Sequence, residues 1–259
     1  MFTSLDFGRL RKVKSLALKS VVTVLRYARE SNGEVIDHGA GFVLYVDTEV
    51  KKVVIITSVA VLADRSSDET IVVRFGNGKD SEASVLVDEP NSILLGLLVS
   101  DVDGYCEAAQ INEDQPIERG QLVATFATVW TRFTDIGMYS GSIIHPSCVS
   151  VRRSKMIMEP VDDFKNYLAF SCPVAGPLYS LKQDANFRRL IGAPVFNLDG
   201  YVVGVTERCS KRSYDLKYAR ISSAILEELI ILFGTDTWQE KLQELVRKKA
   251  EDSLQAANL

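Results

Sequence analysis

Short apolar runs separated by turn residues are the feature that most restricts what this chain can fold into. The runs are rich in Val, Ile and Leu, and Gly, Asn, Asp and Pro divide them at small intervals. They lie at residues 20–30, 38–47, 51–64, 70–80, 83–90, 92–101, 121–130, 141–153, 167–176, 193–198, 201–209 and 218–223. The Gly-Asn-Gly at 76–78 is a typical hairpin signal. This pattern predicts an all-β fold, either an antiparallel barrel or a sandwich.

The two ends of the chain are expected to differ from this pattern. Residues 1–19 are predicted to be a helical or extended segment at the edge of the domain. Residues 224–234 place apolar side chains at helical spacing and stop at Gly234. An amphipathic helix is predicted within 235–259, and we expect its apolar side to pack on the body of the protein.

Composition excludes some functions. The chain has 259 residues, 46% of them hydrophobic, which is enough for a substantial core. Its formal charge of −4 argues against a general nucleic-acid binder, which needs excess basic charge. No window approaches the roughly 20 apolar residues of a membrane-spanning helix. We therefore expect neither nucleic acid nor a membrane among the partners.

The cysteines and histidines do not have the spacing of a metal site. The residues concerned are Cys106, Cys148, Cys172, Cys209, His38 and His145. No Cys-x-x-Cys pair occurs among them, so the sequence predicts no metal and no cofactor. Free thiols and the lack of a clean secretory signal predict an intracellular, cytoplasmic protein that is not secreted. Import into an organelle stays open.

Seven segments, in order, resemble the trypsin-like serine proteases of the HtrA/Deg branch. They read GAGFVLYV (39–46), VVIITSVAVLAD (53–64), NSILLGLLV (91–99), RGQLVATFATV (119–129), YSGSII (139–144), LIGAPVFNLDGYVVGV (190–205) and YARISSAILEEL (218–229). The resemblance extends over residues 20–232. It implies two packed six-stranded β-barrels with a cleft between them.

The resemblance also implies where the domains begin and end. The first barrel is expected within 20–105, a connection within 106–119, and the second barrel with a C-terminal helix within 120–232. Only residues 235–259 follow, which is far short of the roughly 100 residues of a typical domain. We therefore expect no PDZ domain.

The catalytic residues of that family are missing at all three matching positions. In the family a serine attacks the substrate, a histidine accepts its proton, and a carboxylate orients the histidine. The resemblance places the histidine position at Ala60, the aspartate position at Asn91 and the nucleophile position at Ile191. Loss of the serine or the histidine alone costs on the order of 10⁶ in turnover in the best-studied case. The chain is therefore expected to be inactive as an endopeptidase.

The turn around the nucleophile position is altered as well. The family glycine two residues earlier is replaced by Arg189, Leu190 follows it, and a later family glycine is replaced by Ala193. Without glycine the backbone angles of an oxyanion hole become costly. We expect the hole to be collapsed or filled by Ile191, whose side chain should pack against Ala60. Gly192 is expected to keep the turn.

The sequence therefore favours a pseudoprotease that acts as a protein-binding or peptide-binding module. In the family, the strand matching Val203, Gly204, Val205 and Thr206 pairs with an extended substrate through backbone hydrogen bonds, which need no catalytic residues. The partner is not identified by the sequence, and self-association stays open. The alternative is a residual or rewired serine-type or cysteine-type hydrolase.

Overall fold

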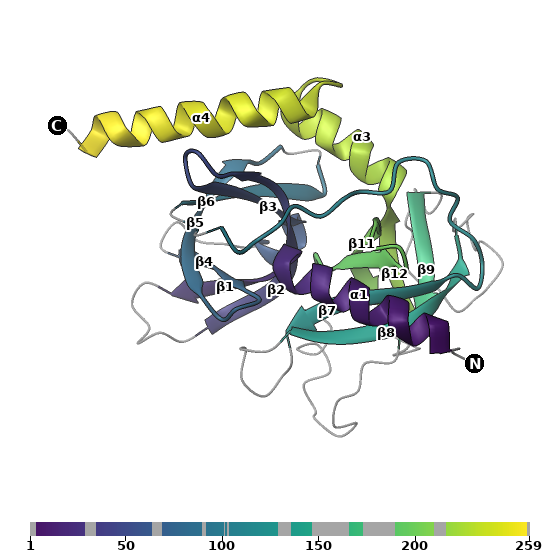
Figure 1. Cartoon of the computed structure of the whole chain (residues 1–259). Helices are drawn as coiled ribbons and strands as arrows, with labels where there is room; N and C mark the ends of the chain where they lie inside the picture. The colour runs from purple at the N-terminus through teal and green to yellow at the C-terminus, as the bar shows by residue number, and fades with distance from the viewer. Residues whose placement is uncertain are drawn as a thin grey trace.

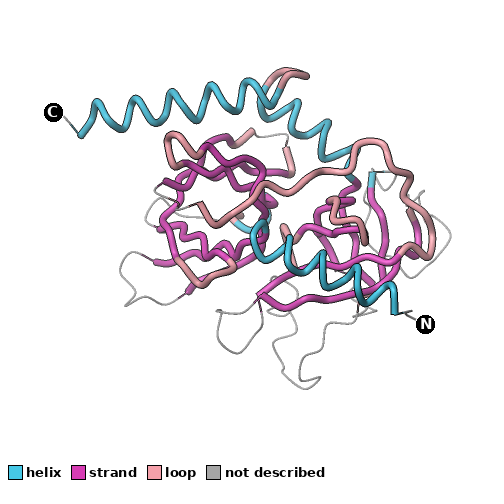
Figure 2. Tube along the Cα trace, in the orientation of Figure 1, coloured by secondary structure: helices cyan, strands magenta, loops and turns pink. Residues whose placement is uncertain are grey.

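The described strands form two closed antiparallel barrels that lie side by side in the computed structural model (Figures 1 and 2). The structure describes residues 4–28, 35–63, 69–89, 92–100, 102, 104–128, 136–146, 166–172, 190–209 and 216–257. Helices lie at both ends of the chain, as Figure 2 shows in cyan. The predicted all-β class with two barrels and terminal helices is confirmed.

The first barrel contains the strands of the N-terminal half. Their order around the barrel is β1 (Val21–Ala28), β2 (Val35–Asp47), β3 (Lys52–Ser58), β6 (Leu94–Ser100), β5 (Asp80–Val87) and β4 (Glu69–Phe75). The barrel closes because β1 pairs with both β2 and β4, with Val22 opposite Gly41 on one side and Phe75 on the other. A short 3₁₀ helix, η1 (Val59–Val61), follows β3.

The second barrel contains the strands of the C-terminal half. Their order is β10 (Pro194–Asn197), β11 (Val202–Cys209), β12 (Leu216–Ile221), β9 (Tyr167–Ser171), β8 (Ile136–His145) and β7 (Leu122–Thr128). It closes where β10 pairs with β7 and Val195 lies opposite Thr125. The two barrels thus share one architecture although no exact repeat is visible in the sequence.

Strand β3 explains why the apolar runs of this chain do not alternate with polar residues. All seven of its residues are buried. Val53 and Ile55 belong to the interior cluster of the first barrel, whereas Val54 and Ile56 belong to the cluster between the barrels. Because successive side chains of a strand point to opposite faces, a strand buried on both faces needs a continuous apolar run.

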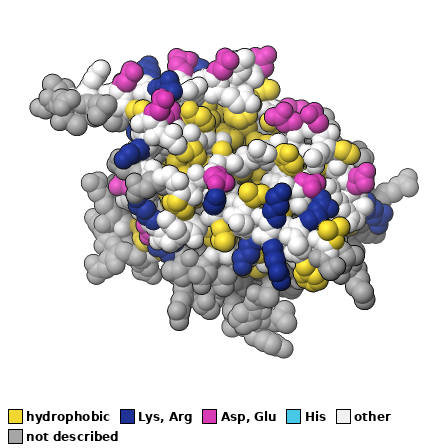
Figure 3. Space-filling model, viewed as in Figure 1, with side chains coloured by type: hydrophobic (Ala, Val, Ile, Leu, Met, Phe, Trp, Pro, Cys, Tyr) yellow, Lys and Arg dark blue, Asp and Glu magenta, His cyan; other side chains and the backbone are white. Residues whose placement is uncertain are grey.

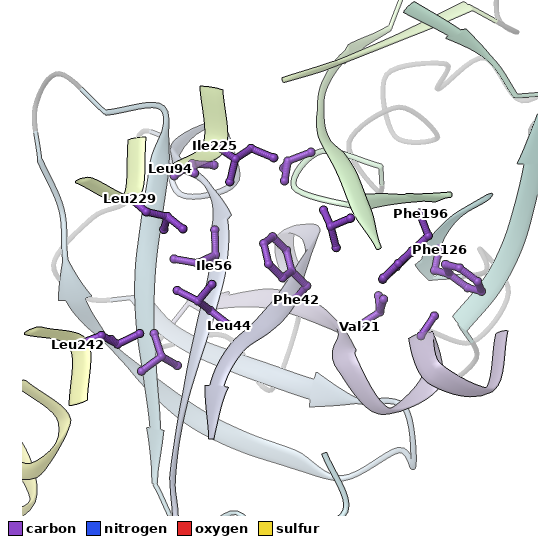
Figure 4. Packing of buried hydrophobic residues seen from close by; sticks show 14 of the residues in the cluster. Val21, Phe42, Leu44, Ile56, Leu94, Phe126, Phe196, Ile225, Leu229 and Leu242 are labelled. Carbon is purple, nitrogen blue, oxygen red and sulfur yellow. The ribbon is translucent and has the colours of Figure 1, made fainter. Parts of the chain in front are cut away.

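The largest cluster fills the space between the two barrels and beneath the helices (Figure 4). The labelled members come from both barrels and from the C-terminal helices: Val21, Phe42, Leu44, Ile56, Leu94, Phe126, Phe196, Ile225, Leu229 and Leu242. The rings of Phe126 and Phe196 meet edge to face with centroids 5.7 Å apart. This shared cluster fixes one barrel against the other.

Three described helices cover this core. Helix α1 (Ser4–Ser20) buries Leu10 and Val13 in the shared cluster. Helix α3 (Ser222–Phe233) ends at Gly234, whose φ of 72° lies in the left-handed region that glycine adopts most easily. Helix α4 (Trp238–Ala257) packs Leu242 and Val246 on the body, as expected. None of the described helices is both long enough and apolar enough to span a bilayer.

The segment between the barrels is hydrogen-bonded to both of them. The Ala109 N–H donates to the Val43 carbonyl in the first barrel, 2.8 Å away. The Asn112 N–H donates to the Val202 carbonyl in the second barrel, 2.9 Å away. The connection is therefore an integral part of the fold that supports β2 and β11.

Candidate functional site

The turn at Leu190–Ala193 joins the two barrels at the predicted nucleophile position. The Ala193 N–H donates to the Leu190 carbonyl, 2.9 Å away, which closes the turn. Gly192 has a φ of 80°. A Cβ atom on Gly192 would lie 2.1 Å from the Ala40 carbonyl oxygen. Only glycine therefore fits both the backbone angle and the close approach to β2.

Main-chain hydrogen bonds hold this turn on two sides. On the first barrel, the Ala40 N–H donates to the Ile191 carbonyl at 2.8 Å, and the Thr57 hydroxyl donates to the Ala40 carbonyl at 2.7 Å. On the second barrel, the Gly192 N–H donates to the Thr206 carbonyl, and the Thr206 N–H donates to the Ala193 carbonyl, each at 2.8 Å. The backbone of the turn is thereby fixed.

The Ile191 side chain is part of the core. It is 8% exposed and belongs to the interior cluster of the first barrel together with Val61 and Cys106. Leu190 and Ala193 are also buried, in a small cluster with Ala40. The expected burial of Ile191 is confirmed.

Ala60 is exposed at the surface and not buried against Ile191 as the sequence predicts. It is exposed on η1, and its N–H donates to the Ser58 hydroxyl at 3.3 Å. The next residue, Val61, is the one that shares a cluster with Ile191. The predicted packing of Ile191 against Ala60 is therefore replaced by packing against Val61, because the Ala60 methyl group stays at the surface.

Asn91 and Arg189 lie outside the described residues, but the neighbour of Asn91 is informative. Ser92 is buried, and its hydroxyl donates to Glu228 Oε2 at 2.7 Å. The Ile93 N–H donates to the same oxygen at 3.1 Å. Glu228 Oε1 accepts from Arg220 at 3.1 Å. This buried carboxylate of α3 ties the Ser92 segment to β12.

Sequence reasoning missed Glu228, although a signal was present. The residues of α3 that face the core are spaced at three and four positions, and Glu228 occupies one of those positions in an otherwise apolar series. A charge at a core position of a helix indicates a buried polar partner. Which segment supplies the partner cannot be read from the helix itself.

The residues predicted for peptide pairing lie in the interior of the second sheet. Val203, Gly204, Val205 and Thr206 are buried. Around them β11 pairs with β10 on one edge and with β12 on the other, and Gly204 lies between Val195 and Ile221. An added strand finds no free edge there.

The pairing of β11 changes further along the strand. Pairing with β10 ends at Val205 opposite Pro194, and the Thr206–Ala193 hydrogen bond follows. Pairing with β12 continues to Cys209 opposite Lys217. Among the described strands, none pairs with the other edge of β11 beyond Thr206. Residues 207–209 therefore extend beyond the pairing of β11 with β10 while the pairing with β12 continues.

The titratable groups near the turn do not form a nucleophile with its base in the described part of the chain. His38 lies in β2 opposite Leu25, and His145 lies at the end of β8 opposite Ala169. Burial raises the pKa of the Cys106 thiol, which disfavours the reactive thiolate. The described residues also hold no cluster of three His, Cys, Asp or Glu suited to a metal.

Comparison with solved structures identifies the fold. The Rv3671c protein of M. tuberculosis, in the inactive form of a serine-to-alanine mutant, superposes with a TM-score of 0.61. The match covers 86% of this chain and 91% of that one, at 16% sequence identity. The fold is trypsin-like. At this identity the likeness shows the fold alone.

The sequence comparisons add no closer relative. No family model matches the sequence, and no curated protein matches it. The role of the turn that carries Ile191 therefore stays a prediction of the family resemblance.

Proposed function

We propose that this chain is a catalytically inactive protein of the trypsin-like fold, derived from the HtrA/Deg branch, that binds an extended segment of a partner protein. The placement of Ile191 carries the first half of this proposal. Its alkyl side chain is buried in the first barrel and its carbonyl is held by Ala40. A branched alkyl group cannot attack a carbonyl, and hydrogen bonds to both barrels hold the backbone of the turn.

Three hydroxyl groups on segments near the turn already take part in hydrogen bonds. Thr57 donates to the Ala40 carbonyl, Ser58 accepts from the Ala60 N–H, and Ser92 donates to Glu228. A hydroxyl nucleophile needs an adjacent base that accepts its proton. Glu228 is a hydrogen-bond acceptor for Ser92, but both side chains are buried beneath α3, where a substrate has no access. These contacts support structural roles for all three hydroxyls.

The second half of the proposal uses residues 207–209 of β11, which extend beyond the pairing with β10. Strand addition to a sheet edge gives affinity through main-chain hydrogen bonds and specificity through alternating side chains. Strand β12 pairs with the opposite edge of β11, and the Tyr167 hydroxyl donates to the Glu207 carboxylate. This support keeps the edge extended, so a bound peptide would not have to order it.

Activity is tested with purified full chain, a fluorophosphonate probe and fluorescent casein. We expect no specific labelling and no turnover. The triple variant Ala60→His, Asn91→Asp, Ile191→Ser should also stay near background, because Arg189 and Ala193 still replace the glycines of the family turn. Labelling of the natural chain that one Ser or Cys substitution removes would establish the rewired hydrolase instead.

Binding is tested by selecting peptides from a displayed library and then scanning a selected peptide with N-methyl groups. N-methylation at alternate positions should abolish binding, whereas the positions between them should tolerate it, because only every second N–H of an added strand faces the sheet edge. Hydrogen exchange should show new protection at 207–209 and none at β4 and β5. A library that yields no binder, or a scan without alternation, refutes strand addition at this edge.

A further inference from the structure

Helix α1 lies along the outside of the molecule, and its exposed side chains form a surface that is separate from β11 (Figure 1). It contacts β2 of the first barrel and β7 of the second. Leu10, Val13 and Ala17 are buried at intervals of three and four residues. This spacing places the buried residues on one side of the helix and leaves the opposite side facing solvent.

The solvent side of α1 concentrates positive charge. The helix holds five basic residues and one acidic residue, a formal charge of +4 in a chain whose total is −4. Arg9 pairs with Asp199, and Lys19 pairs with Glu107. Arg11, Lys12 and Lys14 are exposed. Figure 3 shows dark-blue side chains gathered over α1 on this face.

Large apolar side chains accompany these charges at the N-terminal end of the helix. Leu5 is 71% exposed and Phe7 is 56% exposed, the two highest values among the large hydrophobic residues that stand out from the surface. They do not contribute to the cluster beneath the helix, which uses Leu10 and Val13. Exposed Leu and Phe beside exposed Lys and Arg are the combination that binds the surface of an anionic bilayer.

We propose that the outer face of α1 docks on a bilayer surface that contains anionic lipid. The basic side chains would meet the headgroups, and Leu5 and Phe7 would enter the boundary with the acyl chains. Nucleic acid or a purely acidic protein segment would match the charge but would offer no apolar surface to the exposed Leu5 and Phe7. This surface docking differs from spanning and is independent of β11.

The proposal departs from the expectation that no membrane is among the partners. That expectation rests on charge and hydropathy averaged along the chain. The fold separates the charges in space, since the rest of the chain carries a formal −8 while α1 carries +4. Three exposed basic residues are expected to give roughly a 100-fold preference for anionic over neutral vesicles.

The test is co-sedimentation of the full chain with phosphatidylcholine vesicles, with and without 30% phosphatidylserine, at about 0.1 M salt. The natural chain should bind the anionic vesicles and not the neutral ones. The variant Lys12→Glu, Lys14→Glu should bind more than roughly 30-fold more weakly, because two attractive charges are lost and two repulsive ones are added. Its matched control is Lys248→Glu, Lys249→Glu on exposed positions of α4, which should bind like the natural chain.

A second pair of variants tests the apolar contribution. Leu5→Ser, Phe7→Ser should weaken binding to anionic vesicles roughly tenfold. The control is Ile230→Ser, Ile231→Ser on exposed positions of α3, which should have no effect. Because all eight positions are exposed, circular dichroism should show an unchanged fold. Equal loss in a variant and its control overturns the proposal, as does the absence of binding to anionic vesicles. Polyglutamate that binds through Lys12 and Lys14 while vesicles do not would assign the face to an acidic macromolecule and also overturn it.

Discussion

Two turns carry the residues that the family resemblance predicts for the histidine and nucleophile positions, and they relate to the core in opposite ways. The turn of η1 leaves Ala60 exposed at the surface. The turn at Leu190–Ala193 buries Ile191 in the interior of the first barrel. The first turn therefore presents its predicted site residue at the surface, whereas the second uses its predicted site residue for packing.

This difference implies unequal constraints on the residues at the two positions. A methyl group at an exposed position contributes little to stability, so position 60 is open to many residues. A buried isoleucine is restricted in size and shape by the side chains around it. A smaller residue would leave a cavity and a larger one would exceed the available volume, and both destabilise the core. Four predictions test this contrast.

The largest effect is expected where the buried turn meets the first barrel. Gly192→Ala should destabilise the fold by about 4 kcal/mol or more, since the new Cβ meets the Ala40 carbonyl oxygen at 2.1 Å and the Thr57 hydroxyl at 2.6 Å. Gly120 is the control, because its φ of 83° is similar and nothing lies within 4 Å of its Cβ position. Gly120→Ala should cost only about 1 kcal/mol, the cost of the left-handed backbone. Urea unfolding measures both, and equal costs would contradict a tightly docked turn.

The position of η1 should depend on a buried arginine, Arg26, that bonds the backbone next to it. Arg26, 5% exposed, donates to Glu69 at 2.7 Å and to the Ala63 carbonyl at 2.9 Å just beyond η1. Arg26→Met should cost about 3 kcal/mol because Glu69 then loses a buried partner. Adding Glu69→Leu should restore part of that loss.

A more exposed ion pair of the same barrel provides the control for the Arg26 variant. Arg74 pairs with Asp80 at 2.5 Å, but the pair is more exposed than that of Arg26. Arg74→Met should cost about 1 kcal/mol or less in the same unfolding experiment. If both arginines prove equally dispensable, η1 is held by its own hydrogen bonds and the role assigned to Arg26 fails.

Substitutions at Ile191 and Ala60 compare the two turns directly. Both should change stability less than Gly192→Ala does, and the change should be larger at Ile191. Ile191→Ala should destabilise by about 2 kcal/mol through the cavity that it leaves. Ala60→Ser should change stability by less than about 0.5 kcal/mol, because position 60 is exposed. Thermal or urea unfolding of both variants decides the matter. A costly Ala60→Ser beside a harmless Ile191→Ala would reverse the contrast.

Much of the fold could be predicted because it rests on local patterns. The apolar runs predicted the barrels, and Gly234 predicted the end of α3. The family resemblance located the turn of Ile191, whose apolar side chain also predicted burial. Each of these features depends on residues that are close together in the sequence.

The features that could not be predicted depend on distant pairings. The sequence of β11 does not reveal that its pairing with β10 ends at Val205 while its pairing with β12 continues to Cys209. Likewise, Ala60 and Val61 are adjacent and both apolar, yet only Val61 faces the core, because η1 rotates its residues differently from the preceding strand. Long-range geometry decides both cases.

The last prediction concerns the attachment of α4, which belongs to neither turn. Its expected loss of stability provides a small value with which the effects at the turns can be compared. Asp47, with a side chain 3% exposed, lies 3.5 Å from Arg247 of α4. Burial acts to raise the pKa of Asp47, but hydrogen bonds from the Val50 and Glu49 N–H groups and from the Tyr45 hydroxyl, together with Arg247, outweigh it and lower the pKa. The ionised carboxylate therefore stabilises the folded chain.

Because the folded pKa lies below the unfolded value, this stabilisation is complete above about pH 5 and is lost as the pH falls through the lowered pKa. Asp47→Asn should therefore cost about 1 kcal/mol at pH 7, and the difference from the natural chain should shrink towards pH 3 in urea unfolding. Glu49→Gln removes the exposed carboxylate that contacts the same Arg247 and should cost less than about 0.5 kcal/mol. A cost of Asp47→Asn that stays constant with pH would mean that the side chain acts only as a hydrogen-bond acceptor, and the charge of Arg247 would then have no part in holding α4.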